Sequence, residues 1–135
     1  MWILDSICSD NGQLLTSETI DELFTPQLGV EAQKAFEKFS ATMESSGMFS
    51  SRGPGTEVNY GLGAALILSD LATGVKTGTL FWSGMPNLLW TIDRATGLSL
   101  YYASNILPFG DHTSHRMQQL FEKEMYSRFD RVSKL

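Results

Sequence analysis

Residues 79–111 read TLFWSGMPNLLWTIDRATGLSLYYASNILPFGD. Short apolar runs rich in Leu, Trp, Tyr, Thr and Ile alternate there with Gly, Asp and Pro, a pattern typical of strands and turns. The segment Asp93-Arg94-Ala95-Thr96-Gly97 is polar, ends in Gly and lies between two apolar runs. Such a segment predicts a hairpin turn, so this part of the chain predicts antiparallel strands.

The same pattern extends upstream to Tyr60 and is followed downstream by a helical one. The strand-like runs are Tyr60–Ser69, Thr77–Ser83, Leu88–Ile92 and Leu98–Ala103. They predict an antiparallel sheet of three to four strands over residues 58–105. Asp111 is placed to cap a closing helix over residues 111–131, which we expect to cover one sheet face. Its expected apolar stripe is Met117, Leu120, Phe121, Met125 and Phe129.

Residues 1–45 read as helical and residues 46–57 as a loop. A first helix over residues 2–9 is closed by the turn signal Asn11-Gly12, and a hydroxyl at Thr16 or Ser17 caps a second helix that ends by Pro26. A third helix is predicted from Val30 to about Thr42, and its expected common face is Val30, Ala32, Ala35, Phe36 and Phe39. The order of elements predicts an α+β fold in a single partial domain, residues 1–135. The abrupt hydrophobic start at Trp2 is typical of an internal segment of a longer protein.

Composition excludes several classes of function. The net charge is −5 and the basic residues are scattered, which argues against nucleic acid as a partner. No run approaches the roughly 18 apolar residues of a membrane span. The N-terminus has no basic region and reaches an acid at Asp5, so we do not expect it to be a secretory signal. The single cysteine, Cys8, is expected to be a buried thiol in a reducing compartment. We therefore expect a cytoplasmic protein.

Two strings match motifs of serine hydrolases of the β-lactamase and penicillin-binding type. Those enzymes use Ser-x-x-Lys for nucleophile and base, a triplet such as Ser-x-Asn for proton transfer, and Lys-Thr-Gly on a strand. The chain holds Ser9-Asp10-Asn11 and Lys76-Thr77-Gly78, but no Ser stands three positions before any Lys. Too few residues precede Ser9 for the first motif. We interpret Ser9-Asp10-Asn11 as a helix-ending turn and Lys76-Thr77-Gly78 as a chance match.

Histidine and acidic residues near the C-terminus have a plainer interpretation. His112 and His115 could pair on a metal, but no Glu or Cys joins them at ligand spacing. We interpret both as residues of a solvated first helical turn, and residues 122–124 (Glu-Lys-Glu) as a solvated helix face. The sequence predicts no metal and no cofactor.

Residues 78–111 resemble part of a known family. Trp82-Ser83-Gly84 is followed by an aromatic strand, the pair Ile92-Asp93, a Gly turn and the segment Leu107-Pro108-Phe109-Gly110-Asp111. This order resembles the C-terminal third of class C β-lactamase-like esterases and acyltransferases. It is most similar to the fungal transesterases that attach short acyl groups to polyketide alcohols, in which Trp-Gly-Gly replaces Lys-Thr-Gly. Tyr60-Gly61-Leu62-Gly63 and residues 12–15 and 23–28 extend the resemblance over nearly the whole chain.

The resemblance implies a partial β-lactamase/transpeptidase-like fold and one wall of an acyl site. Carried over by position, the backbone of Trp82, Ser83 and Gly84 would line that site, and Met85 would supply an oxyanion N–H. Ser83 departs from the middle Gly of the family and adds a side chain where close approach is needed. Lys76 would share a strand face with Trp82 but lie about 20 Å from it, too far to act there.

Two functions remain open from the sequence. In the first, the chain is a truncated acyltransferase or esterase relative of fungal polyketide biosynthesis, inactive alone because it lacks the Ser-x-x-Lys element. Its substrates would be an acyl thioester or a polyketide alcohol. In the second, it is a non-catalytic α+β domain that binds a ligand or completes the sheet of another chain. In both, the sheet would leave an apolar edge for a protein partner that supplies the missing strands.

Overall fold

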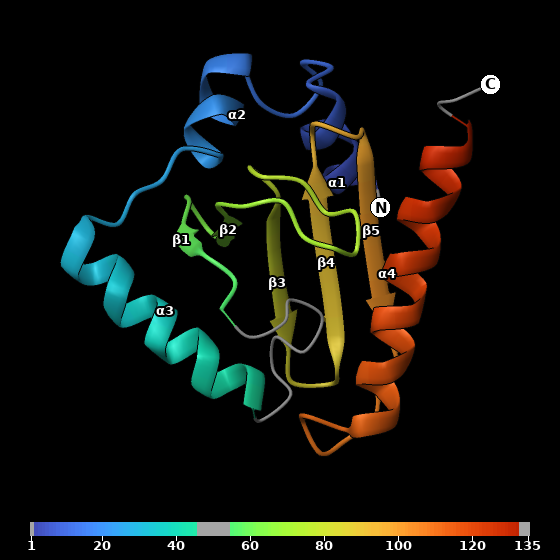
Figure 1. Cartoon of the computed structure of the whole chain (residues 1–135). Helices are drawn as coiled ribbons and strands as arrows, with labels where there is room; N and C mark the ends of the chain where they lie inside the picture. The colour runs from blue at the N-terminus through green and yellow to red at the C-terminus, as the bar shows by residue number, and fades with distance from the viewer. Residues whose placement is uncertain (1, 46–54, 133–135) are drawn as a thin grey trace.

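The computed structural model describes residues 2–45 and 55–132, and its elements follow the predicted α+β order (Figure 1). The sheet has five strands, so the expectation of three to four was too low. Except for residues 55–57, the predicted loop over 46–57 lies outside the described residues. The elements are α1 (Trp2–Ser9), α2 (Ser17–Leu23), α3 (Val30–Ser45), β1 (Val58–Tyr60), β2 (Ala65–Ile67), β3 (Leu80–Gly84), β4 (Leu88–Asp93), β5 (Leu98–Ala103) and α4 (His112–Val132).

The strands form one antiparallel meander in the order β1-β2-β3-β4-β5. Its longest ladder is the β4–β5 hairpin, which runs from Leu88 opposite Ala103 to Asp93 opposite Leu98. Asp93 starts the turn by accepting a hydrogen bond from the Thr96 N–H through Oδ1 (3.1 Å), and Gly97 takes the left-handed φ of 73°. The hairpin predicted from this segment is confirmed.

The extra strand is β1, which lies at the start of the predicted Tyr60–Ser69 run and mostly before it, whereas only Ala65–Ile67 of that run form a strand, β2. Between them the Gly61 N–H donates to the Ala64 carbonyl (2.9 Å), and Gly63 has a φ of 96°. A side chain at Gly61 would collide with the Leu23 carbonyl oxygen of α2. The turn therefore brings β1 back beside β2 and seats α2 against it.

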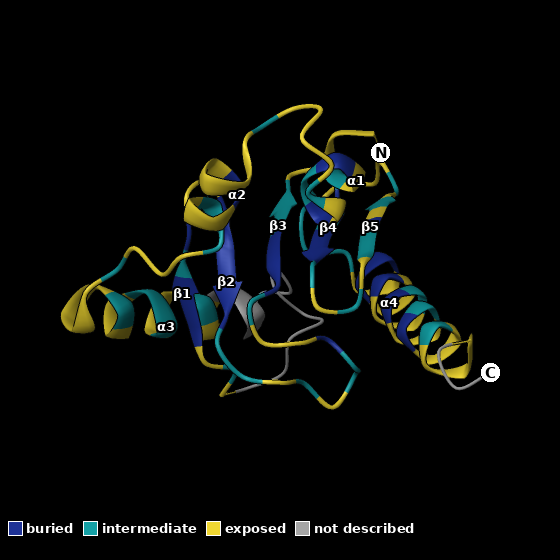
Figure 2. Ribbon diagram, turned by 90° about the horizontal axis from the view of Figure 1, so that it is seen from above, coloured by how far each residue is buried: buried dark blue, intermediate teal, exposed yellow. Residues whose placement is uncertain are grey.

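Helices cover both faces of the sheet, with α1 and α4 on opposite sides of β4 and β5 (Figures 1 and 2). On the α1 side, Cys8 packs in a cluster with Leu66, Leu80 and Ile92. On the α4 side, Tyr126 packs in a second cluster with Ile67, Phe81 and Leu89, among others. The sheet therefore separates two apolar cores, and α3 and α2 also contribute to them through Phe36 and Leu23 respectively.

The inward faces of two helices differ from those predicted. Along α4 the buried residues are Ser114, His115, Gln118, Glu122 and Tyr126, whereas Met117 and Leu120 are more than half exposed. Along α3, Val30 is 69% exposed and Phe36 is partly buried. The predicted α4 stripe is confirmed only in part: Phe121 and Met125 pack on the core, whereas most fully buried positions of α4 are polar and meet polar partners on the sheet, as described below.

Helix starts agree with the sequence. The Thr16 hydroxyl accepts from the Thr19 N–H (3.3 Å) and caps α2, and Asp111 Oδ1 accepts from the Ser114 N–H (2.7 Å) and caps α4. These bonds satisfy amide donors that have no partner within the helix. Local capping chemistry was sufficient to place both helix starts.

Asp93 at the end of β4 joins three parts of the fold. Its Oδ2 accepts from the Tyr126 hydroxyl of α4 (2.9 Å) and from the Lys76 N–H (3.2 Å). Its carbonyl oxygen accepts the weak S–H bond of Cys8 from α1 (3.5 Å). Asp93 is 1% exposed, so the Tyr126 hydroxyl and the Lys76 N–H replace the water that its carboxylate loses on folding.

Substituting Tyr126→Phe should lower the free energy of unfolding by about 1.5–3 kcal/mol, because a buried hydrogen bond to a carboxylate is lost with little change of shape. Urea unfolding followed by circular dichroism measures the effect. Tyr101→Phe is the matched control, since Tyr101 is 46% exposed, and should stay within about 0.5 kcal/mol. Equal effects of the two substitutions would contradict a special role for the Asp93 bond.

Candidate functional site

The predicted acyl-site wall lies on the second half of β3 and the turn after it. Trp82, Ser83 and Gly84 register against Trp90, Leu89 and Leu88 of β4. The register of β3 with β2 covers Leu80 and Phe81, so the wall lies beyond the end of β2. Met85 begins the β3–β4 turn and is 68% exposed.

Trp82 is held by a row of aromatic rings. Its ring meets Tyr60 of β1 edge-on, with centroids 5.5 Å apart, and Tyr60 meets Phe36 of α3 in the same way at 5.5 Å. Edge-to-face pairs at this spacing are favourable, so they orient the rings as well as bury them. The row links β3 to α3 and gives this side of the strand an apolar, aromatic character.

Lys76-Thr77-Gly78 lies in a turn and not on a strand, because β3 begins at Leu80. Lys76 Nζ pairs with Asp70 Oδ2 at 2.9 Å, and the Thr77 N–H donates to Asp70 Oδ1 at 2.9 Å. The Thr77 and Lys76 hydrogen bonds lower the pKa of Asp70 to about 2. The expectation that Lys76 shares a strand face with Trp82 was wrong, and this ammonium is engaged in an exposed surface pair.

Ser9-Asp10-Asn11 forms the turn that ends α1, as predicted. The Ser9 hydroxyl donates back to the Asp5 carbonyl (2.8 Å), and Asp10 has a left-handed φ of 49°. The Asn11 side chain accepts from the Ser6 hydroxyl (2.7 Å) and from the Gln13 N–H. These local bonds are those of a helix end.

Two residues that the sequence placed on the surface are buried. His115 is 7% exposed and Glu122 is 1% exposed, although His112 faces solvent. Within residues 2–45 and 55–132, no three His, Cys, Asp or Glu side chains come together as a metal site would require. Burial lowers the pKa of His115, with Asp111 opposing and His112 adding to the shift.

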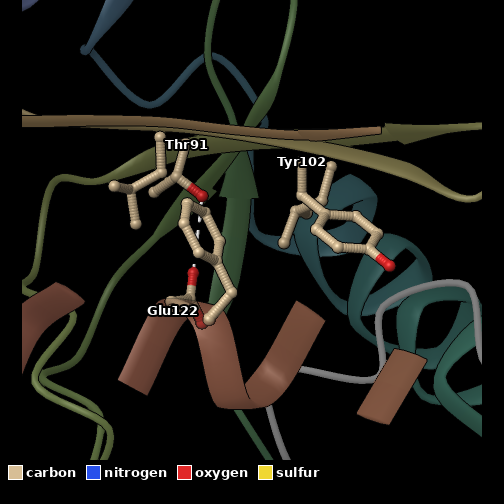
Figure 3. A pocket seen from close by; sticks show the side chains of 6 residues that line it. Thr91, Tyr102 and Glu122 are labelled. Carbon is tan, nitrogen blue, oxygen red and sulfur yellow. Dashed lines mark hydrogen bonds between the residues drawn. The ribbon is translucent and has the colours of Figure 1, made fainter. Parts of the chain in front are cut away.

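A line of buried polar contacts between α4 and the sheet was not foreseen. The Thr91 hydroxyl donates to Glu122 Oε1 (3.4 Å), and Figure 3 shows Glu122 pointing from α4 toward Thr91. Farther along the helix, Gln118 Nε2 donates to the Asn87 carbonyl (3.0 Å). We call Asn87, Thr91, Asp93, Gln118, Glu122 and Tyr126 the polar seam. The spacing of Gln118, Glu122 and Tyr126 at i, i+4 and i+8 is the sequence signal that could have revealed its helical half.

The space around Thr91 and Glu122 is filled. Leu89, Leu100, Tyr102 and Phe121 complete its lining, and it leaves no room for a water-sized sphere. The Tyr102 and Phe121 rings lie 6.3 Å apart. The seam is therefore packed structure and not a ligand cavity.

Cys8 is a buried thiol, as predicted. It is 7% exposed, and burial raises its pKa to about 11, with Asp93 and Asp5 adding to the shift. A thiol of this kind holds its proton at neutral pH and is a poor nucleophile.

Among the described helices, none combines the length and hydropathy that a membrane span requires.

Comparison with known proteins finds relatives over nearly the whole chain. No family model matches the chain. It is 30% identical over 95% of its length to the methylbutanoyltransferase mlcH of Penicillium citrinum and 32% identical over 94% to the lovastatin esterase of Penicillium rubens. A mutant of simvastatin synthase (LovD) from Aspergillus terreus superposes on 96% of the chain with a TM-score of 0.87 and 25% identity. The chain matches the C-terminal third of the fungal transesterases.

The match is confined to that part of a transesterase. The chain spans 31% of mlcH, 32% of the lovastatin esterase and 32% of the simvastatin synthase structure. The resemblance stated from residues 78–111 is thus confirmed, as is the β-lactamase-like α+β plan. The role of Trp82, Ser83, Gly84 and Met85 as a site wall stays a prediction.

His115 should make stability depend on pH. Because its pKa is lowered in the fold, the unfolded chain binds the extra proton more readily below about pH 6.5, and stability falls as pH decreases through that value. Unfolding measured between pH 7.5 and 5.5 should show this slope, and His115→Gln should reduce it. His112→Gln is the control and should retain most of it. An unchanged slope in His115→Gln would refute the assignment.

Proposed function

We propose that residues 1–135 supply one wall of a serine acyl-transfer site, formed by Trp82, Ser83, Gly84 and the N–H of Met85. The observation that carries the proposal is the exposed end of β3: Met85 is 68% exposed directly after a glycine. A backbone N–H at such a tip can donate to a developing oxyanion.

The nucleophile and base would come from residues other than these. No Lys in the sequence is preceded by Ser at the third position, so the Ser-x-x-Lys element is absent from residues 1–135. Serine acyl transfer needs an activated hydroxyl beside the oxyanion donors. We therefore propose that residues 1–135 form a single partial domain that does not turn over substrate alone.

The names of the relatives and the aromatic row support our proposal for the substrate class. The relative mlcH is named as a methylbutanoyltransferase, and another relative is named as a lovastatin esterase. Trp82, Tyr60 and Phe36 offer an apolar surface beside the wall, suited to a short branched acyl group or a polyketide alcohol. A cytoplasmic location is also part of this proposal.

Reconstitution of a complete transesterase from two parts tests the proposed acyl-site wall. The chain is mixed with the N-terminal two-thirds of a fungal transesterase, which carries the nucleophile, and transfer from a methylbutanoyl thioester to an alcohol is assayed. We expect no turnover from either part alone and turnover from the mixture. Met85→Pro removes the N–H and should lower kcat by roughly 10²–10³-fold, the usual cost of one oxyanion donor. Lys76→Ala should leave kcat unchanged.

Met85→Ala keeps the N–H and is the matched control. The unfolding midpoint of each variant, and its binding to the N-terminal part, separate misfolding from a lost donor. Full activity of Met85→Pro would contradict the oxyanion assignment. Tight binding without turnover by the wild-type mixture would favour the non-catalytic partner domain instead.

We further propose that a protein partner adds a strand along the outer edge of β5. This strand ends the sheet, and the helices on its two sides, α1 and α4 (Figure 1), carry exposed apolar side chains: Trp2 and Ile3 of α1 are 58% and 55% exposed, and Met117 and Leu120 of α4 are 51% and 52% exposed. An apolar sheet edge of this kind pairs readily with another strand.

Amide hydrogen exchange locates that partner. Binding of the N-terminal transesterase part should slow exchange in β5 at least tenfold, because new ladder bonds protect its amides. β1, the opposite edge, is the internal control and should change less. Protection of β1 amides with none at β5 would mean that the partner binds the opposite edge of the sheet. That result would contradict the proposal.

A further inference from the structure

Asn87 lies at the end of the β3–β4 turn, two positions after Met85, and is 1% exposed. Its φ is 52°, in the left-handed region that asparagine tolerates better than most residues. A buried amide is costly unless its donors and acceptor are satisfied. The side chain of Asn87 must therefore be matched by partners from elsewhere in the chain.

Those partners come from the loop that precedes α4. Asn87 Nδ2 donates to the carbonyls of Ile106 (2.8 Å) and Pro108 (2.9 Å). Its Oδ1 accepts from the N–H groups of Gly110 (2.9 Å) and Asp111 (3.3 Å). The Asn87 carbonyl also accepts from the Ser104 hydroxyl (3.3 Å). One side chain thus closes four hydrogen bonds to a loop 19 to 24 positions away.

The turn and this loop lie together at the lower end of the sheet in Figure 1. That end also carries the exit of β3 and the exposed side chains Met85, Ile106 and Leu107, which are 68%, 42% and 68% exposed. Only Met85, Pro86 and Asn87 separate β3 from β4, so the Asn87 bonds lie two positions from the Met85 N–H.

We propose that Asn87 is a positioning residue of the acyl site: it anchors the β3–β4 turn to residues 104–111 and so fixes the Met85 N–H and an apolar rim of Met85, Ile106 and Leu107. This inference rests on the proposed function. An oxyanion donor acts only when it is held in place before the reaction, and misplacement by about 1 Å can cost 10²-fold in rate. The rim faces solvent beside that donor and suits the apolar part of an acyl group or alcohol.

The first test needs no activity. Asn87→Gly keeps the left-handed turn accessible but deletes all four side-chain bonds, and Asn87→Asp keeps the acceptor but loses both donors. Hydrogen exchange on the chain should show the Gly110 and Asp111 amides exchanging at least tenfold faster in Asn87→Gly and less changed in Asn87→Asp. Unchanged exchange in both variants would overturn the anchoring role.

The second test uses the reconstituted complex. Asn87→Gly should lower kcat by about 10–100-fold while KM stays within about threefold, as expected when an interaction made only in the transition state is weakened. Tyr126→Phe, which removes a buried bond at the opposite end of β4, is the control for general destabilisation and should leave kcat near wild type.

The outcomes separate the two proposals. Equal losses of kcat in Asn87→Gly and Tyr126→Phe, or a change in KM alone, would overturn the positioning role. An inert wild-type complex would count against the proposed function and remove the positioning role with it, whereas the exchange result would still decide whether Asn87 holds the loop. If Asn87→Gly fails to fold, Asn87→Asp should show the same direction of change in kcat.

Discussion

The carboxylate of Asp93 is the contact on which the rest of the fold depends. It receives the Tyr126 hydroxyl from α4 and the Lys76 N–H from the preceding turn, and the Cys8 thiol meets its carbonyl from α1. Elements from the two ends and the middle of the chain therefore converge on one residue of β4. A buried carboxylate tolerates this position only when donors surround it, which makes the arrangement specific as well as stable.

β4 is anchored at both ends by polar residues that serve different purposes. Asp93 at its C-terminal end joins the two helical layers, whereas Asn87, just before its N-terminal end, joins the β3–β4 turn to the loop before α4. Between them Thr91 contacts Glu122. The polar seam thus sets the register of α4 on the sheet, while the apolar clusters supply most of the buried surface.

The sequence predicted those features that depend on local chemistry. The Asp93–Gly97 hairpin and the caps at Thr16 and Asp111 involve residues within four positions of one another. The residue types at those positions are therefore enough to predict them. The sequence predictions were wrong where contacts between residues distant in the chain determine the structure. Glu122 looks solvated until Thr91 is placed opposite it. The run from Tyr60 to Ser69 looks like one strand, but Tyr60 ends β1, Gly61 lies against the Leu23 carbonyl of α2, and only Ala65–Ile67 form β2. The candidate wall came from resemblance. Asn87 could not be recognised, because its partners are brought to it by the folded sheet.

The buried thiol of Cys8 can report on local opening of the structure. Its sulfur is covered by α1 and the end of β4, in contact with the same Asp93 that α4 binds from the other face. Reagents that modify sulfur can reach it only when α1 lifts from the sheet. The rate of Cys8 labelling would therefore measure how often α1 separates from the sheet. It would distinguish this motion from separation of α4.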